Sequence, residues 1–173
     1  MIPHFFQTIG GWFDYEEFYA DMVKRFDSGT FVEVGIGRGR SLAFLCVEVL
    51  NSGKPIDVVG VDNLSMWPDQ AEQLEKNLKP LLDIGHPPTL ILKNSAVAAS
   101  WVADKSIEFC FIDATHEYDY VMSDIRSWLP KVRPGGIIAG HDFDEHWPDV
   151  KRAVRDSFLS RFKVTKNVWW VEV

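Results

Sequence analysis

Two short polar segments contain residue types that can do acid–base or metal chemistry. Asp113 is followed three positions later by His116, and His141 stands directly before Asp142. Each segment comes after an apolar run that is typical of a buried strand. Because the carboxyl ends of neighbouring strands in an open parallel sheet meet at one crevice, we expect both segments to face a single site.

Clustered carboxylates raise one another's pKa unless a positive charge offsets them. Asp144 and Glu145 are also nearby, so a divalent cation is a natural counter-charge, and carboxylate ligands suit magnesium, calcium or manganese. Other interpretations stay open. His116 could be a structural hydrogen-bonding residue, and His141 could do no more than orient Asp142. Two histidines and one carboxylate also match a non-haem iron site, which the glycine-rich turn described next disfavours.

A glycine-rich turn lies between a strand-like run and a helix-like run. Gly35, Gly37 and Gly39 let the backbone turn sharply and approach a ligand closely. The fingerprint of NAD-binding folds needs a further glycine three positions after the second, and that position is Arg40. Glu33, inside the preceding strand, suits a ligand with an ammonium group and no phosphate. A nicotinamide-dependent reductase is therefore disfavoured.

A second acid follows the next strand-like run. Asp62 comes directly after Val59-Gly60-Val61, roughly twenty residues beyond the glycine-rich turn, where an acid can hydrogen-bond both ribose hydroxyls of a nucleotide. An aspartate in this place can equally cap the loop before the following helix.

The segment from Glu33 to Gly39 resembles the first motif of class I S-adenosylmethionine-dependent methyltransferases, whose acid and glycines receive the methionine part of the cofactor. The resemblance implies that Asp62 and Asn63 bind ribose and that Asn94 and Ser95 contact adenine, although Asn94 also suits an ordinary helix N-cap. The implied cofactor-binding residues are Glu33, Gly35, Gly37, Gly39, Ser41, Asp62, Asn63, Asn94, Ser95 and Asp113.

The polar segments resemble the metal-dependent O-methyltransferases, a branch that includes the catechol and macrolide-sugar enzymes. The likeness covers roughly Thr30 to Arg155 and is carried by Ile112-Asp113-x-x-His116-x-Tyr118 and by Gly135-Gly136 followed by His141-Asp142.

This second resemblance implies a division of roles. Asp113, His141 and Asp142 would hold a divalent cation, Mg²⁺ before others, and His116 would be the general base for a hydroxyl of a small acceptor such as a sugar. His141 departs from the catechol enzymes, which have a carboxylate there. The alternative is an inactive cofactor-binding module that serves as a partner or regulatory domain.

Strand-like and helix-like runs alternate along the chain, which predicts an α/β fold with a doubly wound, Rossmann-like, seven-stranded and mostly parallel sheet. Lys166-Asn167 is too short for a crossover, so the sheet should end in an antiparallel C-terminal hairpin. We expect one domain, 1–173, with 1–29 as an N-terminal helical segment. Expected helices are Tyr15–Phe26, Ser41–Leu50, Asp69–Leu78, Ala96–Val102, Tyr118–Leu129 and Pro148–Leu159. Expected strands are Thr30–Val34, Ile56–Val61, Thr89–Leu92, Ile107–Ile112, Ile137–Ala139, Arg161–Thr165 and Val168–Val173.

The amino-acid composition limits the kinds of molecule that the protein can be expected to bind. The 18 Lys and Arg residues are outnumbered by 25 Asp and Glu residues, a net charge of -7, which argues against binding to nucleic-acid phosphates. Cys46 and Cys110 lie in apolar runs and suggest no disulfide framework. With no signal peptide and no membrane-spanning run in sight, we expect a cytoplasmic protein, without membrane contact, that acts on a small molecule.

Seven tryptophans are many for this length. Trp101 and Trp128 fall on expected helices and are predicted to be core residues. Trp12, Trp67 and Trp147 fall in loops, where an aromatic wall could stack on cofactor or acceptor. Trp169 and Trp170 should point to opposite faces of the last strand, so that one of them could join the interface of a homo-oligomer.

Overall fold

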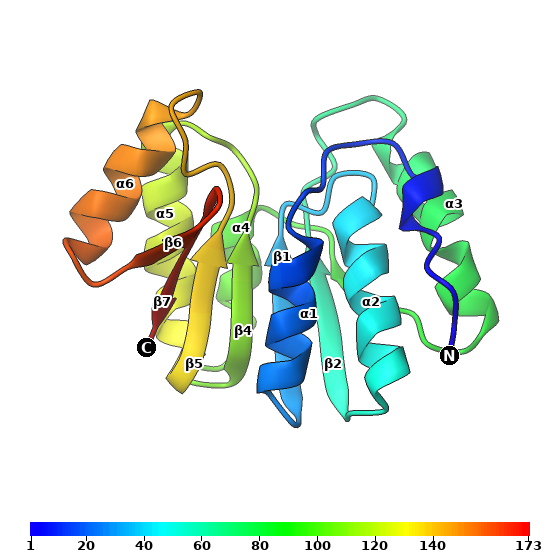
Figure 1. The fold of residues 1–173 in the computed structure, drawn as a ribbon. Coiled ribbons are helices and arrows are strands. Elements are labelled where there is room, and N and C mark those ends of the chain that lie inside the picture. Colours follow the sequence, from blue (N-terminus) through cyan, green and yellow to red (C-terminus); the bar gives the residue numbers. More distant parts are fainter.

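The computed structural model describes residues 1–173, and a seven-stranded sheet runs through its centre (Figure 1). The strand order is β3-β2-β1-β4-β5-β7-β6. The first five strands pair in parallel, whereas β7 is antiparallel to both β5 and β6, which confirms the predicted fold class. The strands are β1 (Gly29–Val34), β2 (Ile56–Val61), β3 (Thr89–Ile91), β4 (Ile107–Ile112), β5 (Val132–Gly140), β6 (Lys163–Thr165) and β7 (Val168–Glu172).

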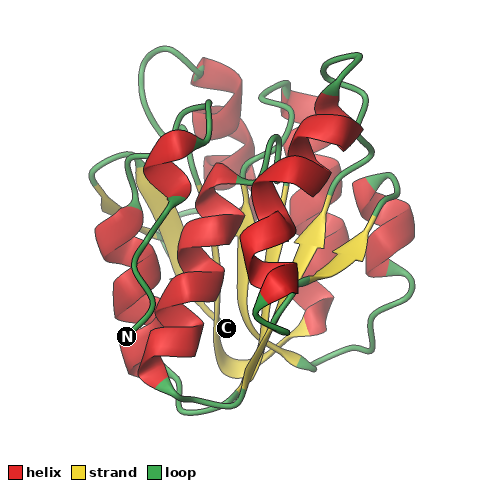
Figure 2. Cartoon of the chain, turned by 90° about the vertical axis from the view of Figure 1, so that its right-hand side faces the viewer, coloured by secondary structure: helices red, strands yellow, loops and turns green.

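Helices cover both faces of the sheet, and Figure 2 shows them on either side of the strands. One core cluster joins the sheet to α1, α2 and α3, and the other joins it to α4, α5 and α6. The central strands β1 and β4 are therefore buried on both sides, which explains their nearly continuous apolar sequences. The helices are α1 (Glu16–Arg25), α2 (Arg40–Ser52), α3 (Gln70–Asp83), α4 (Ser95–Ala99), α5 (Tyr118–Trp128) and α6 (Pro148–Phe158), with 3₁₀ turns at Phe6–Thr8 and Leu129–Lys131.

Two element boundaries differ substantially from the prediction. β5 begins at Val132, so the expected turn Pro134-Gly135-Gly136 lies inside the strand as an irregularity, where Gly135 takes a φ of 76° and its N–H still bonds to the carbonyl of Val173. Helix α3 continues five residues past Leu78 and through Pro80, because the next residue, Leu81, is fully buried and stabilises the additional turn.

The tryptophans divide differently from the prediction. Trp128 and Trp169 are core residues, but the prediction for Trp101 was wrong: it is 63% exposed, because α4 ends before it at Ala99. Trp12 is 93% exposed, in the loop that leads into α1.

The segment before α1 crosses the side of the sheet where the strands end (Figure 1). Phe13 and Tyr15 belong to the core cluster, and the ring of Tyr15 lies 4.6 Å from that of Phe111 in β4. Aromatic burial therefore fixes this segment beside the strand ends. No helix has both the length and the apolar character needed to span a membrane.

Candidate active site

The glycine-rich turn brings the end of β1 against the loop that follows β4. Gly35 has a φ of 89°, and a Cβ at this position would lie 2.0 Å from the carbonyl oxygen of Asp113. Only glycine allows this approach. The N–H of Gly35 bonds to Val61 and the N–H of Asp113 bonds to Val34, each at 2.8 Å, so the two loops continue the hydrogen bonding of the sheet.

Glu33 is fully buried below this turn. One carboxylate oxygen accepts a hydrogen bond from the hydroxyl of Ser41, and the other, Oε2, has no partner. Burial raises the pKa of Glu33 to about 8 and the charge of Asp113 adds to this, although the Ser41 hydroxyl opposes it. An unpartnered, buried carboxylate oxygen is suited to an ammonium group, because a cationic donor would satisfy it and favour its ionised form.

Asp62 follows β2 and ties the glycine-rich turn to the next loop. Its Oδ2 accepts from the N–H of Gly37 at 3.0 Å, and its Oδ1 accepts from the N–H of Leu64 at 2.7 Å and from Nε2 of Gln70 at 3.1 Å. Gln70, which is 1% exposed, also donates to the carbonyl of Gly37. Gln70 was not predicted from the sequence, since a glutamine in the first turn of a charged helix has no distinguishing pattern.

The remaining residues implied for the cofactor have local structural partners. Oδ1 of Asn63 accepts from the N–H and hydroxyl of Ser65. Asn94 is the N-cap of α4, accepting from the N–H of Ala96, and the Ser95 hydroxyl accepts from Nε1 of Trp128. The structure therefore shows the capping alternative for Asn94, and an adenine contact stays a prediction.

The ends of β4 and β5 bring Asp113, His141 and Asp142 together, with one potential ligand atom from each lying within 4.8 Å of the others. Nδ1 of His141 lies 3.1 Å from Oδ1 of Asp142. Nε2 of His116 lies 2.6 Å from the other Asp142 oxygen, and its ring stacks on Trp147 with centroids 4.0 Å apart. The predicted convergence of the two polar segments is confirmed.

Charge and burial compete in this cluster. Burial alone would raise the pKa of Asp142, but its contacts with His116 and His141 lower it well below the ordinary value. Burial alone would lower the pKa of His141, but the neighbouring carboxylates of Asp142, Asp113 and Asp14 raise it to about 9. Burial raises the pKa of Asp113. The positive charge of His141 thus already offsets part of the negative charge of the two carboxylates.

Two residues of the N-terminal segment also contact the cluster, and neither was predicted from the sequence. Oδ1 of Asp14 lies 2.8 Å from Nε2 of His141, and the hydroxyl of Tyr15 donates to Oδ2 of Asp113 at 2.9 Å. They lie about a hundred or more residues from their partners along the chain, and nothing in the local pattern of Asp14-Tyr15 distinguishes it from an ordinary helix start.

The loop tryptophans take different positions. Trp147 borders the cluster through its stack on His116. Trp67 lies near the glycine-rich turn, under the guanidinium of Arg38 at 4.7 Å. Trp12 has no aromatic contact and projects outward. Stacking of Trp67 or Trp147 on cofactor or acceptor stays a prediction.

Comparison with protein families identifies one model, described as "Methyltransferase domain", which matches residues 32–143. Two curated relatives are an uncharacterized protein of Acanthamoeba polyphaga mimivirus, 29% identical over 134 residues, and the uncharacterized protein y4gI of Sinorhizobium fredii, 23% identical over 147 residues. The alignments cover 74% and 81% of this chain but only 58% and 16% of those proteins. The chain thus spans less than two thirds of either relative.

Solved structures with the same fold include two described as O-methyltransferases and one described as a methyltransferase. A candidate caffeoyl-CoA O-methyltransferase from Staphylococcus aureus has a TM-score of 0.71 at 11% identity, covering 96% of this chain and 87% of that one. CalS11, a TDP-rhamnose 3′-O-methyltransferase, has 0.66 at 15%, covering 91% and 76%. MycE, in complex with Mg, S-adenosylhomocysteine and mycinamycin VI, has 0.65 at 16%, covering 95% and 50%. These likenesses establish the fold.

Proposed function

We propose, from the premise that the chain belongs to the methyltransferase domain family, that it transfers the methyl group of S-adenosylmethionine to a hydroxyl oxygen of a small molecule. The observation that carries the proposal is the cluster beside the glycine-rich turn. His116 lies 2.6 Å from Asp142, and Asp142 is within ligand distance of Asp113 and His141. A proposed base and a proposed set of cation ligands thus lie at the same end of the sheet as the glycine-rich turn.

The cofactor would be held at the ends of β1 and β2. The unpartnered Oε2 of Glu33 supports an ammonium contact with the methionine part of S-adenosylmethionine. Asp62 is already oriented by Gly37, Leu64 and Gln70 and retains one acceptor position, on Oδ2, for a ribose hydroxyl. At Gly35 the turn packs directly against the main chain of Asp113, with no side chain between the two backbones.

A divalent cation fits the cluster. Asp113, His141 and Asp142 offer two carboxylates and one imidazole from adjacent strand ends, a set that accepts Mg²⁺ or Mn²⁺. Mg²⁺ is the proposed ion, and the Mg in the MycE complex supports it. When bound, the ion would lower the pKa of a hydroxyl group beside it.

His116 is the proposed general base. Its Nε2 lies 2.6 Å from Asp142 but forms no hydrogen bond there, and in its neutral form the ring has one nitrogen lone pair that can accept the hydroxyl proton. The stack on Trp147 limits rotation of the ring. As the acceptor oxygen forms its bond to the methyl carbon, the carbon–sulfur bond breaks and the proton remains on His116. Alignment of the two reactants would supply much of the acceleration.

A small hydroxylated acceptor, such as a sugar, fits these observations best. The excess of carboxylates opposes a nucleic-acid substrate, and the TDP-rhamnose specificity stated for CalS11 supports a sugar. We propose a cytoplasmic protein without membrane contact. Trp170, which is partly buried on the last paired strand, would contribute to a homo-oligomer interface.

Two measurements test the proposal together. Isothermal titration calorimetry should show binding of S-adenosylmethionine, and mass spectrometry should show a methyl increment on members of a panel of sugars and catechols when Mg²⁺ or Mn²⁺ is present. Failure to bind the cofactor at millimolar concentration would refute the proposal. Binding with no transfer under any metal would instead support an inactive module that acts as a partner domain.

A further inference from the structure

We infer that Asp14 and Tyr15 are positioning residues that hold His141 and Asp113 in the orientation needed to bind a divalent cation. The inference rests on the metal-assisted function proposed above. It assigns a role to a segment that lies outside the residues matched by the family model, 32–143. Its basis is that two adjacent residues each contact one of two different candidate ligands.

The contact with His141 separates the functions of its two ring nitrogens. Nε2 lies 2.8 Å from Oδ1 of Asp14, whereas Nδ1 lies 3.1 Å from Asp142, on the side of the cluster. Metal-binding histidines usually donate their second ring N–H to a carboxylate or carbonyl, which fixes the tautomer and raises the basicity of the ligand nitrogen. Asp14 would therefore keep hydrogen on Nε2, so that Nδ1, on the side of Asp142, is the nitrogen that gives up its proton and becomes the ligand when a cation binds.

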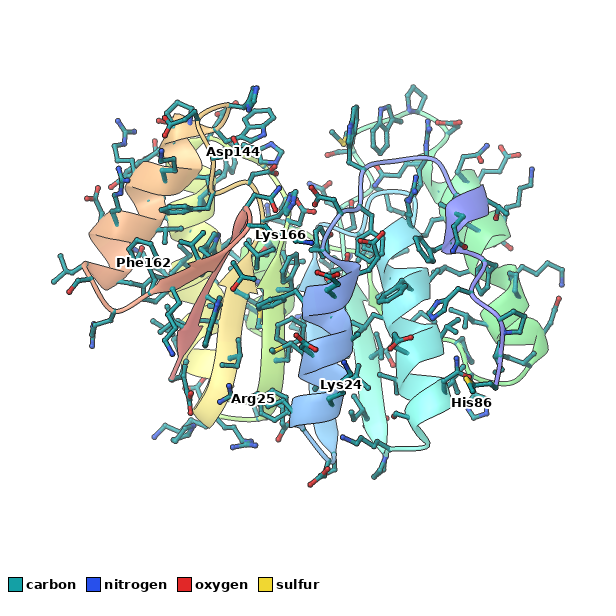
Figure 3. All side chains as sticks on the ribbon, in the orientation of Figure 1. Lys24, Arg25, His86, Asp144, Phe162 and Lys166 are labelled. Carbon is teal, nitrogen blue, oxygen red and sulfur yellow. The ribbon has the colours of Figure 1, made fainter.

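A second hydrogen bond, from the turn between β6 and β7, also holds Asp14 in place. Its second oxygen, Oδ2, accepts from the side-chain amide of Asn167 at 3.3 Å, in the turn between β6 and β7. The adjacent Lys166, labelled in Figure 3, forms an ion pair with Glu17 at 2.9 Å. The backbone carbonyl of Asn167 accepts from Phe143, directly after the candidate ligands. The antiparallel hairpin thus supports both Asp14 and the loop it contacts.

Tyr15 acts on the other ligand. Its hydroxyl donates to Oδ2 of Asp113 at 2.9 Å, which leaves Oδ1 unengaged by Tyr15. The tyrosine is 3% exposed, and its ring lies 4.6 Å from Phe111 and 4.8 Å from His141. The phenol is therefore a rigid donor whose position is set by core packing, and it fixes the torsion of the Asp113 carboxylate.

A purely structural role would give different behaviour. If Asp14 and Tyr15 only attached the N-terminal segment to the sheet, loss of any comparable attachment would have a similar effect. Glu17 provides the matched control, because its ion pair with Lys166 joins the same segment to the same turn without touching His141 or Asp113.

The experiment titrates Mn²⁺ into the full chain without acceptor, following free Mn²⁺ by electron paramagnetic resonance. The proteins are the wild type, Asp14→Ala, Asp14→Asn, Tyr15→Phe and Glu17→Ala. We expect Asp14→Ala to weaken Mn²⁺ binding about 10- to 100-fold. Asp14→Asn should recover part of this loss, because its amide oxygen still accepts from Nε2. Tyr15→Phe should weaken binding less than Asp14→Ala does, and Glu17→Ala should leave affinity within twofold.

A second readout reports the tautomer. In the wild-type protein loaded with Zn²⁺, ¹⁵N spectra of the histidine rings should show hydrogen on Nε2 of His141 and the metal on Nδ1. The inference is overturned by wild-type affinity in Asp14→Ala, by an equal loss in Glu17→Ala, by the opposite tautomer, or by a wild-type protein that binds no Mn²⁺. S-adenosylmethionine binding and methyl transfer, measured separately, decide the proposed function, so the two failures are distinguishable.

Discussion

At the ends of β1 and β2 the candidate site is built from main chain and from side chains that lie at most 33 positions from their partners. At the ends of β4 and β5 it is built from side chains of separate segments. Asp62 reaches Gly37 across 25 positions, whereas Asp14 reaches His141 across 127. The first region depends on backbone shape, and the second on tertiary contacts between ionisable groups. The two regions should therefore respond differently to substitution.

The largest effect is expected where the two regions touch. Gly35→Ala places a methyl group 2.0 Å from the Asp113 carbonyl oxygen, in a backbone conformation with a φ of 89°, so both loops must move apart. We expect a loss of about 4 kcal/mol or more in the free energy of unfolding, or no folded protein. Urea denaturation followed by circular dichroism measures this.

Gly37→Ala is the matched comparison for this substitution. A Cβ there would meet only Trp67 at 3.8 Å, with a φ of 53°, so about 1 kcal/mol is expected. Equal destabilisation by the two substitutions would show that contact between the loops is not what requires glycine at position 35.

The next effect lies in the second region alone. His116→Ala should lower the rate of methyl transfer about 10²- to 10⁴-fold, because the base is lost, while the affinity for S-adenosylmethionine stays within about twofold. Single-turnover kinetics and calorimetry measure the two quantities. A variant that retains the wild-type rate would rule out His116 as the base, and a parallel loss of cofactor affinity would show that the two regions are not separable.

A pH-dependent effect distinguishes the first region. The pKa of Glu33 is about 8 in the folded protein, against an ordinary value of 4.5. Between pH 4.5 and 8 the folded protein keeps a proton on Glu33 that the unfolded chain has released. The free energy of unfolding that this group contributes is therefore fully present below pH 4.5 and is lost as the pH rises through 8. Glu33→Gln removes this dependence.

Relative to the wild type, Glu33→Gln should thus gain stability between pH 5 and 8.5, by on the order of a few kcal/mol. Thermal denaturation at both pH values measures the difference. The same variant should bind S-adenosylmethionine about tenfold more weakly. A constant difference between the two proteins across this range would show that Glu33 is not a buried, protonated acid.

The smallest effect concerns the choice of ion. The imidazole of His141 in the ligand set should make Mn²⁺ bind about tenfold more tightly than Mg²⁺, since nitrogen ligands favour first-row transition ions. Competition titration measures the ratio. His141→Asp should reduce the preference, and an unchanged ratio in that variant would argue against a bond from His141 to the ion.

The same contrast explains what the sequence could predict. Alternating apolar runs predicted every strand and helix and the antiparallel end of the sheet, because each run forms its element locally. The predicted boundaries were wrong where tertiary contacts decide where an element begins or ends. The burial of Leu81 extends α3, and pairing with β4 and β7 continues β5 from Val132 through Gly135.

For the site, the order of the strands alone brought Asp113 near His141 and Asp142, so their convergence was predictable. Asp14, Tyr15 and Gln70 were not. Their roles depend on where a loop or helix start falls after the chain has folded, and neither spacing nor composition records that position.

The contact at Gly35 also sets the distance between the glycine-rich turn and the loop after β4. Because main chain meets main chain between the glycine-rich turn and Asp113, the distance between these two loops is set by the backbone, whichever side chains the rest of either loop carries. Under the proposed function, residue exchanges in the loops after β4 and β5 would change the choice of acceptor without moving these two loops apart. Acceptor preference could in this way differ between relatives while the spacing of the two loops stays the same.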